Sequence, residues 1–288
     1  MINYSFIIPH KNTPDLLRKC LDSIPRREDV QIIVVDDNSD ADKVDFEHFP
    51  GAEDPSVEVH FTKEGRGAGY ARNVGLEHAT GKWLVFADAD DFFCPSVAEA
   101  MDDYCDSKCD VVFFKGSAIN LADETPSFRC DELNRRVDVA IRTGDCTLPL
   151  LYSSPWMKFF SRSFIKTNHI TFNEVRWGND VVFMAKVARY VEKCAASPLE
   201  IYCITESRDS LVSKKTIDSA LVRLEQECQE VSIVRPRYGN EESIYYWLFQ
   251  TWMGVYKFNR GKALLSLPKA MQAGGWGFIR QMIKKKIG

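Results

Sequence analysis

Residues 82–91 read KWLVFADADD, a run of apolar side chains that ends in three carboxylates. Continuous apolar residues are typical of a strand covered on both faces, as in a parallel sheet with helices on either side. Residues 31–37, QIIVVDD, repeat the pattern, because a β-branched apolar run again ends in aspartates. Ligands of such sheets bind at the carboxyl ends of the strands, so we expect both acidic clusters at one edge of the sheet.

The remainder of the first 115 residues alternates between short apolar strands and helical segments. We predict further strands at residues 5–8, 57–61 and 110–114, and helices at 14–24, 70–79 and 95–108. The first strand is expected to stop at Pro9, and a flexible glycine-rich loop, GRGAG, precedes the helix at 70. This alternation predicts an α/β fold with a largely parallel sheet and helices on both of its faces.

The regular alternation fades after residue 115. Residues 116–145 are polar and remain unassigned, whereas 181–190 are apolar enough for a packed helix, with Asn179 and Asp180 as its cap. A further helix is predicted at 217–234.

Composition favours a soluble globular protein, with 45% hydrophobic and 27% charged residues. The segment MINYSFIIPHKN has no basic region before its apolar run, so it does not resemble a secretion signal. The nine cysteines are odd in number and contain no CxxC pair, which argues against a disulfide framework and a zinc site. We therefore expect reduced, structural cysteines in a cytoplasmic protein.

Charge is distributed unevenly along the chain. Residues 243–288 contain eight Lys and Arg and no Asp or Glu, so the other residues carry −12 within a total of −4. The same tail is rich in large apolar side chains, a mixture that suits an anionic membrane surface or an amphipathic helix pair packed on the main domain. It has no apolar stretch near the ~20 residues of a spanning helix. The acidic main body argues against nucleic-acid binding.

Asp88, Asp90 and Asp91 place three carboxylates on four consecutive positions. Their mutual repulsion has to be offset by a cation or by hydrogen-bond donors. A hard divalent ion such as Mg²⁺ is commonly held by one or two carboxylates, while substrate phosphates complete its shell. The alternative is that Asp91 caps the helix near Pro95 and the other two carboxylates are solvated.

Three stretches in this half together resemble a known family. SFIIPHKN at 5–12, IIVVDDNSD at 32–40 and GAGYARNVGLEHATGKWLVFADADDFFCP at 67–95 are similar, in order and spacing, to the family 2 glycosyltransferases of the GT-A fold. The resemblance covers roughly residues 3–115. It implies a GT-A, Rossmann-like, mostly parallel sheet with a mainly helical C-terminal extension. The implied parts are a donor-binding half at 1–115, an acceptor-binding half at 116–215, and a basic, aromatic extension at 216–288.

The resemblance also implies roles for donor-site residues. Pro9 would lie beside the nucleobase, and Asp37 would accept a hydrogen bond from a base nitrogen. Asp88 would approach the ribose, and Asp90 would bind the Mn²⁺ or Mg²⁺ ion that bridges the pyrophosphate. Further residues would order the glycine-rich loop and the donor side of the pocket (Arg72 and Asn73) or contact the diphosphate (Arg208).

The acceptor side is implied by a second group of residues. Inverting transfer needs a base that takes the proton of the acceptor hydroxyl, and Asp180 is nominated for it. Asn179 stands where the family commonly has Glu. Trp177 and Gly178 would shape the acceptor pocket, together with an upstream W-x-K segment (Trp156 and Lys158). Lys158 is expected to meet a phosphate or to order the acceptor wall, and Trp156 is equally compatible with core packing.

The resemblance, together with the acidic clusters, implies a metal-dependent glycosyltransferase. It would move a sugar from a nucleotide-diphosphate sugar, with UDP favoured, to a glycan or lipid-linked glycan during bacterial surface-polysaccharide synthesis at the cytoplasmic membrane face. The alternatives are a non-catalytic, membrane-associated nucleotide-binding scaffold and a nucleotidyltransferase. A Rossmann dehydrogenase is disfavoured, because the glycine-rich loop follows the third predicted strand rather than the first.

Overall fold

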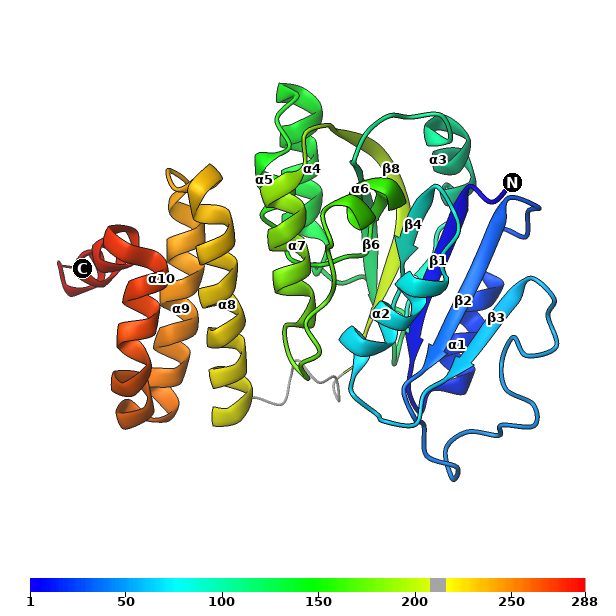
Figure 1. Cartoon of the computed structure of the whole chain (residues 1–288), viewed down its shortest axis with the longest axis horizontal. Helices are drawn as coiled ribbons and strands as arrows, with labels where there is room; N and C mark the ends of the chain where they lie inside the picture. Colours follow the sequence, from blue (N-terminus) through cyan, green and yellow to red (C-terminus); the bar gives the residue numbers. More distant parts are fainter. Residues whose placement is uncertain (208–215, 288) are drawn as a thin grey trace.

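The computed structural model describes residues 1–207 and 216–287, which fold around one eight-stranded sheet (Figure 1). The strand order is β3-β2-β1-β4-β7-β6-β8-β5. In chain order the strands are β1 (Tyr4–His10), β2 (Val30–Asp36), β3 (Val57–Phe61), β4 (Trp83–Phe86), β5 (Phe92–Phe93), β6 (Val111–Asn120), β7 (Lys158–Ser161) and β8 (Cys194–Glu206).

The first four strands of the sheet form a parallel unit. β1 pairs with β2 on one side and with β4 on the other, and β2 pairs with β3. Helices α1 (Pro14–Asp22) and α2 (Ala68–His78) connect these strands in opposite directions across the sheet, so right-handed crossovers place them on opposite faces (Figure 1). The predicted α/β fold is confirmed, and the carboxyl ends of β1, β2 and β4 lie at one edge.

Pro9 does not end the first strand, as the sequence had suggested. β1 continues to His10, and Pro9 pairs with Val35 of β2. The Ile7 carbonyl accepts from the Ala87 amide on the β4 side, so backbone alternation turns Pro9 to the same side. β4 has ended at Phe86 by then, and the missing N–H of Pro9 therefore removes no hydrogen bond from the sheet.

The second half of the sheet is mixed in direction. β7 lies antiparallel between β4 and β6, β8 runs parallel to β6, and β5 is an antiparallel edge strand on β8. Residues 116–145, which the sequence left unassigned, form the end of β6 and the long helix α4 (Asp131–Thr143). The helices of this half are α3 (Val97–Tyr104), α4 (Asp131–Thr143), α5 (Thr147–Leu150), α6 (Arg162–Thr167) and α7 (Asn179–Tyr190).

The C-terminal region is helical, as predicted. It contains α8 (Ile217–Tyr238), α9 (Glu242–Phe258) and α10 (Arg260–Ile287), which is broken at Gly275. α8 packs on α7, and α9 and α10 continue the layer away from the sheet (Figure 1). Some large apolar residues of the tail are buried between these helices (Tyr245, Leu248, Phe249, Trp252 and Phe278), while others are exposed (Tyr246, Trp247 and Trp276). Among the described helices, none has the length and apolar character needed to cross a membrane.

Two local predictions are wrong. Helix α7 begins at Asn179, so Asn179 and Asp180 form its first turn and Gly178 is the capping residue. Cys146 and Cys194 are joined by a disulfide, with Cα atoms 6.5 Å apart, although all cysteines were expected to be reduced. An odd number of cysteines excludes complete pairing but not a single bond between residues distant in sequence. The cysteine argument for a reducing compartment therefore no longer holds.

Candidate active site

The ends of β1 and β2 are fixed to each other by a buried hydrogen bond between side chains. His10 Nδ1 lies 2.7 Å from Asp36 Oδ1, and Asp36 also accepts hydrogen bonds from the amide and hydroxyl of Ser39. Burial opposes the charge of Asp36, yet the hydrogen bonds from His10 and Ser39 hold its pKa below the usual range. Asp36 is thus a structural carboxylate that shapes the turn carrying Asp37.

Asp37 is buried, with 3% of its surface exposed. Its Oδ2 accepts a hydrogen bond of 2.8 Å from the Gly67 amide in the glycine-rich loop. Its Oδ1 is buried and has no hydrogen-bond partner among the described residues. An unpaired buried acceptor is costly, so Oδ1 is suited to an N–H donor from a ligand.

The three aspartates after β4 occupy different environments. Tyr202 of β8 accepts from the Asp88 amide and donates to Asp91 Oδ2, each at 2.9 Å. The Thr205 amide donates to Asp91 Oδ1 at 2.7 Å, so Asp91 is buried and tied to β8 rather than capping a helix. Asp90 is exposed, and Asp88 is half-buried.

This aspartate cluster fits a hard divalent cation. Oxygen atoms from Asp88, Asp90 and Asp91 lie within 4.8 Å of one another. Desolvation of the Asp90 carboxylate by the surrounding protein is the main cause that raises its pKa to about 6, and the charge of Asp88 is the second cause. Burial, with the charges of Asp88 and Asp90, raises the pKa of Asp91 well above its usual value. A cation would relieve this repulsion, and carboxylate oxygens are the ligands that Mg²⁺ and Mn²⁺ prefer.

Arg72 connects this cluster to the start of α7. It is 6% exposed, donates through Nη2 to Asp88, and donates through Nη1 to Asn179 Oδ1 at 2.8 Å. Its guanidinium also lies 5.4 Å from the ring centroid of Phe172. Asn179, the departure from the family's usual Glu, therefore serves as an arginine acceptor.

Asn73 binds protein backbone. Its side chain exchanges two hydrogen bonds with Phe172, accepting from the amide at 2.9 Å and donating to the carbonyl at 3.0 Å. Gly69 lets helix α2 approach the backbone of the 172–179 segment closely, because a Cβ at this position would lie 2.2 Å from the Asn173 carbonyl oxygen. The first turns of α2 thus fix the segment that leads into α7.

The predicted acceptor residues at 177–180 surround the start of α7. Gly178 has φ 69°, a left-handed conformation that favours glycine, and turns the chain into the helix. Burial raises the pKa of Asp180, while the charge of Arg72 opposes the increase. The Trp177 Nε1 donor is buried and has no partner within the described part of the chain. This turn therefore presents a carboxylate and an unpaired donor close together in sequence.

Trp156 and Lys158 lie deeper than the acceptor-pocket prediction implies. Trp156 is 8% exposed and stacks on Tyr202 at 6.3 Å. Lys158 is fully buried and donates to the carbonyls of Ser154 and Trp156 at 2.7 and 3.3 Å. This burial and these two hydrogen bonds favour the predicted role of ordering the acceptor wall over contact with a phosphate. Arg208, the predicted diphosphate ligand, lies outside the described residues.

The sequence reasoning missed residues of α8. Arg223, Glu227 and Glu230 are spaced to share one helix face. The charge of Arg223 lowers the pKa of Asp180, and the charge of Asp180 raises the pKa values of Glu227 and Glu230. Burial is the main cause that raises the pKa of Glu227 to about 7, and it raises that of Glu230 well above the usual value. Charges at i, i+4 and i+7 on a partly apolar helix were the available signal. Tyr202, which orders two aspartates, carried no signal in the sequence.

A sequence model of glycosyl transferase family 2 matches residues 5–167, more than half of the chain. The chain belongs to glycosyl transferase family 2. The resemblance carried by the sequence segments is therefore confirmed.

Relatives of this family 2 member include proteins of bacterial polysaccharide synthesis. It is 28% identical to the uncharacterized glycosyltransferase YibD of Escherichia coli, over 66% of this chain and 59% of that protein. It is 26% identical to the succinoglycan biosynthesis protein ExoO of Rhizobium meliloti, over 77% and 66% respectively. It is also 26% identical to a poly(ribitol-phosphate) beta-glucosyltransferase of Bacillus spizizenii, over 71% of this chain but only 32% of that enzyme.

Solved structures share the GT-A fold of this family 2 member. S. aureus TarS, residues 1–349, superposes with a TM-score of 0.65 at 19% identity, covering 97% of this chain and 80% of that one. TarS has also been solved with UDP-GlcNAc, with a TM-score of 0.64, 19% identity, and coverage of 94% and 79%. A mannosyltransferase of Pyrobaculum calidifontis with GDP-Man and Mn²⁺ gives 0.58 at 16% identity, covering 99% and 79%.

Proposed function

We propose that this family 2 member transfers a sugar from a nucleoside-diphosphate sugar to an acceptor hydroxyl, with inversion at the anomeric carbon. The observation that carries the proposal is the arrangement at the strand ends. A buried carboxylate oxygen of Asp37, which has no partner among the described residues, lies at the same edge as the aspartate cluster at 88–91. Arg72 links that cluster to the turn that holds Asp180.

The donor would lie across the ends of β1, β2 and β4, in the donor half at residues 1–115. Asp37 Oδ1 would accept from a ring N–H of the base beside Pro9, and Asp88 would approach the ribose. Asp90 would hold a divalent metal, with Mn²⁺ and Mg²⁺ as the candidates. Such an ion neutralises charge on the leaving diphosphate. Arg72 and Asn73 would act as positioning residues, because their contacts fix Asp88 and the 172–179 segment.

The acceptor would approach from the turn before α7, in the half at residues 116–215. Asp180 would take the proton of the acceptor hydroxyl as that oxygen attacks the anomeric carbon, and the bond to the diphosphate oxygen breaks on the opposite side. A raised pKa suits this role, since a base acts best with a pKa near the working pH. Trp177 and Gly178 would shape the pocket, while Trp156 and Lys158 would support its wall from the core.

We favour a UDP-sugar as donor and a surface glycan as acceptor. The TarS complex with UDP-GlcNAc and the succinoglycan protein ExoO support this choice. The mannosyltransferase complex with GDP-Man and Mn²⁺ makes a GDP-sugar the first rival donor. Retention of Asp37, Asp90 and Asp180 disfavours a non-catalytic scaffold.

The test is calorimetric binding of UDP, GDP, CDP and ADP, each with and without Mn²⁺, to wild-type protein, Asp90→Asn and Asp102→Asn. Asp102 is an exposed carboxylate on α3 and provides the matched control. We expect one diphosphate to bind in a way that requires both Mn²⁺ and Asp90. Nucleotide binding by none of the four, or binding unaffected by Asp90→Asn, would contradict the proposal.

The pH dependence of the same binding provides an independent check. The Asp90 pKa is raised to about 6, so protons compete with the metal below that pH. Metal-dependent nucleotide affinity should therefore be full above pH 7 and decline as the pH falls through about 6. Asp102→Asn should show the same profile as wild type.

We further propose that residues 243–288 contact the anionic cytoplasmic face of a membrane, where a lipid-linked glycan would be presented. Exposed Trp247, Leu265 and Trp276, together with the basic residues of this tail, support the proposal. Flotation with phosphatidylglycerol vesicles should recover the wild-type protein at low salt. Substituting all three residues by Ser should abolish recovery, whereas Phe46→Ser with Phe128→Ser should not. Equal recovery of both variants would exclude this surface.

A further inference from the structure

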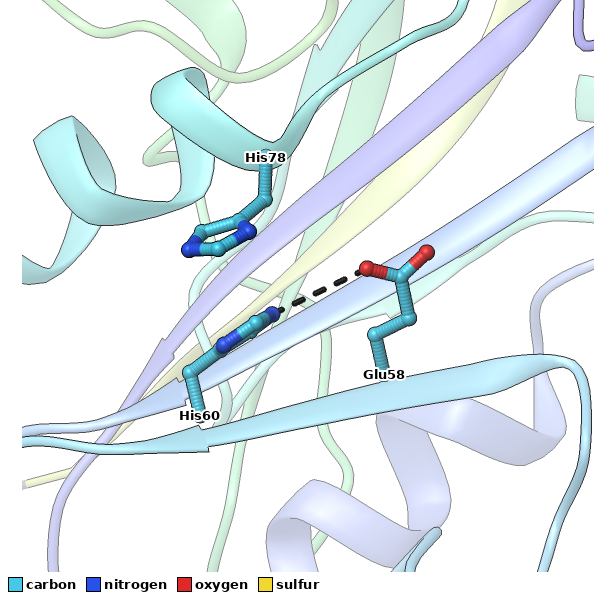
Figure 2. Close-up of side chains that lie close together, drawn as sticks. All are labelled: Glu58, His60 and His78. Carbon is cyan, nitrogen blue, oxygen red and sulfur yellow. Dashed lines mark ion pairs between the residues drawn. The ribbon is translucent and has the colours of Figure 1, made fainter.

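A second cluster of metal-ligating side chains lies away from the aspartates. Glu58 and His60 alternate along β3 and so project from one face of this edge strand, while His78 lies at the end of α2. Figure 2 shows the two imidazole rings facing each other, with the Glu58 carboxylate beside His60. Ligand atoms of the three residues lie within 4.8 Å of one another.

One ligand atom of this cluster has no hydrogen-bond partner among the described residues. His60 Nε2 is buried and has no hydrogen-bond partner among the described residues, although Glu58 Oε2 lies 3.7 Å away (Figure 2). The rings of His60 and His78 stack with centroids 3.9 Å apart and planes at 27°. Two cationic imidazoles would repel at this distance. A metal ligand must be a neutral imidazole, which this close stacking of the two rings favours over a cationic pair.

A buried amide holds the cluster in position. Gln31 Nε2 donates to Glu58 Oε1 at 2.7 Å and to the His78 carbonyl at 3.1 Å. Gln31 is itself fixed, because its Oε1 accepts from Ser5 and from Thr80. Ordered hydrogen bonds to ligand carboxylates are a common feature of metal sites. Gln31 thus fixes the Glu58 carboxylate and the backbone at His78 relative to each other.

We propose that Glu58, His60 and His78 bind a divalent transition-metal ion, with Zn²⁺ as the preferred species. Two imidazoles and one carboxylate form a donor set that suits Zn²⁺, and water would complete the tetrahedron. The harder, all-oxygen aspartate cluster selects Mg²⁺ or Mn²⁺ instead. Bound Zn²⁺ would join β3 to the C-terminal end of α2 and would stabilise the packing of this helix on the edge strand.

The test uses untagged full-length protein, freed of metal with chelator and titrated with Zn²⁺ by calorimetry and with Co²⁺ by visible absorption. We expect one Zn²⁺ per chain in wild type and in Asp90→Asn, and a rise in Tm on binding. His60→Gln and His78→Gln should each weaken Zn²⁺ affinity at least tenfold and remove the Tm rise. His48→Gln and His169→Gln change exposed histidines outside the cluster and should leave both readouts unchanged.

Folding of the variants is checked by their Tm in chelator, which should match that of wild type. Glu58→Gln preserves an acceptor for Gln31 and serves as a second test, in which Zn²⁺ affinity should again fall. Unchanged Zn²⁺ affinity in both histidine variants would overturn the proposal. Loss of the site in Asp90→Asn would also do so, because it would assign the ion to the aspartates.

Discussion

The donor edge and the acceptor wall are built by different means. At the donor edge, Asp37 directly follows β2 and Asp88 lies two residues after β4, so parallel strand pairing already places both at the same edge of the sheet. At the acceptor wall, Asp180 is surrounded by groups from distant parts of the chain, and contacts such as that of Asn173 with Gln226 at 2.6 Å fix its surroundings. Strand pairing sets the positions of the donor-edge carboxylates, whereas the position of Asp180 depends on contacts between distant segments. The two should therefore respond separately to substitution.

The largest expected effect separates chemistry from donor binding. Asp180→Asn removes the proposed base, so we expect kcat to fall by about 10²–10⁴-fold. The affinity for the preferred nucleoside diphosphate with Mn²⁺ should stay within about twofold of wild type, because Arg72 reaches the start of α7 through Asn179, which this substitution leaves in place. Steady-state transfer assays and calorimetry measure the two quantities, and Asp218→Asn, an exposed carboxylate of α8, is the control. A parallel loss of nucleotide affinity would show that the two regions are one unit.

The donor edge itself is tested at Asp37. Asp37→Asn keeps the shape but removes the charge that faces the base, and the loss of a charge-assisted hydrogen bond is worth about 1.5–3 kcal/mol. Nucleotide affinity should fall roughly 10–100-fold, while kcat at saturating donor changes little. Asp42→Asn, an exposed residue of the following loop, is the matched control. Unchanged affinity would mean that Asp37 Oδ1 does not receive the base.

The difference between the two regions also explains what the sequence could predict. Apolar runs ending in aspartate mark strand ends, so the positions of Asp37 and Asp88 follow from local pattern and parallel topology. No local pattern shows that Tyr202 bonds the Asp88 amide, or that Lys158 is buried, since both depend on the antiparallel insertion of β7 and the return of β8. The disulfide escaped prediction for the same reason, because 48 residues separate its cysteines.

The junction of the two regions is tested at Gly69. An added methyl group would meet the Asn173 carbonyl at 2.2 Å, so Gly69→Ala has to displace the segment before α7. Such overpacking costs about 1–3 kcal/mol, partly offset by the better helix propensity of Ala. Denaturant unfolding should show this loss. Gly254→Ala on α9 is the control, because the position that its methyl group would take has no neighbouring atom within 4 Å among the described residues, and it should be neutral or stabilising. Equal stability of both variants would show that α2 does not hold the segment.

The smallest effect concerns a buried cation of the acceptor half. Burial lowers the pKa of Lys158 to about 7, whereas an unfolded lysine keeps a pKa near its ordinary value of 10.5. Between pH 7 and about 10.5 the unfolded chain therefore binds more protons at this site than the folded chain, so this residue makes stability rise with pH in that window.

Lys158→Met removes the titrating group while keeping similar volume. The free energy of unfolding of wild type, relative to that of the variant, should increase by about 1 kcal/mol from pH 7 to pH 8. Urea unfolding at both values measures it, and Lys166→Met, at an exposed position of α6, should reproduce the wild-type dependence. Because the Lys158 ammonium is bonded only to carbonyls in the described structure, a flat difference would mean that an anion pairs with it, and the acceptor wall would then resemble the ion-paired donor edge.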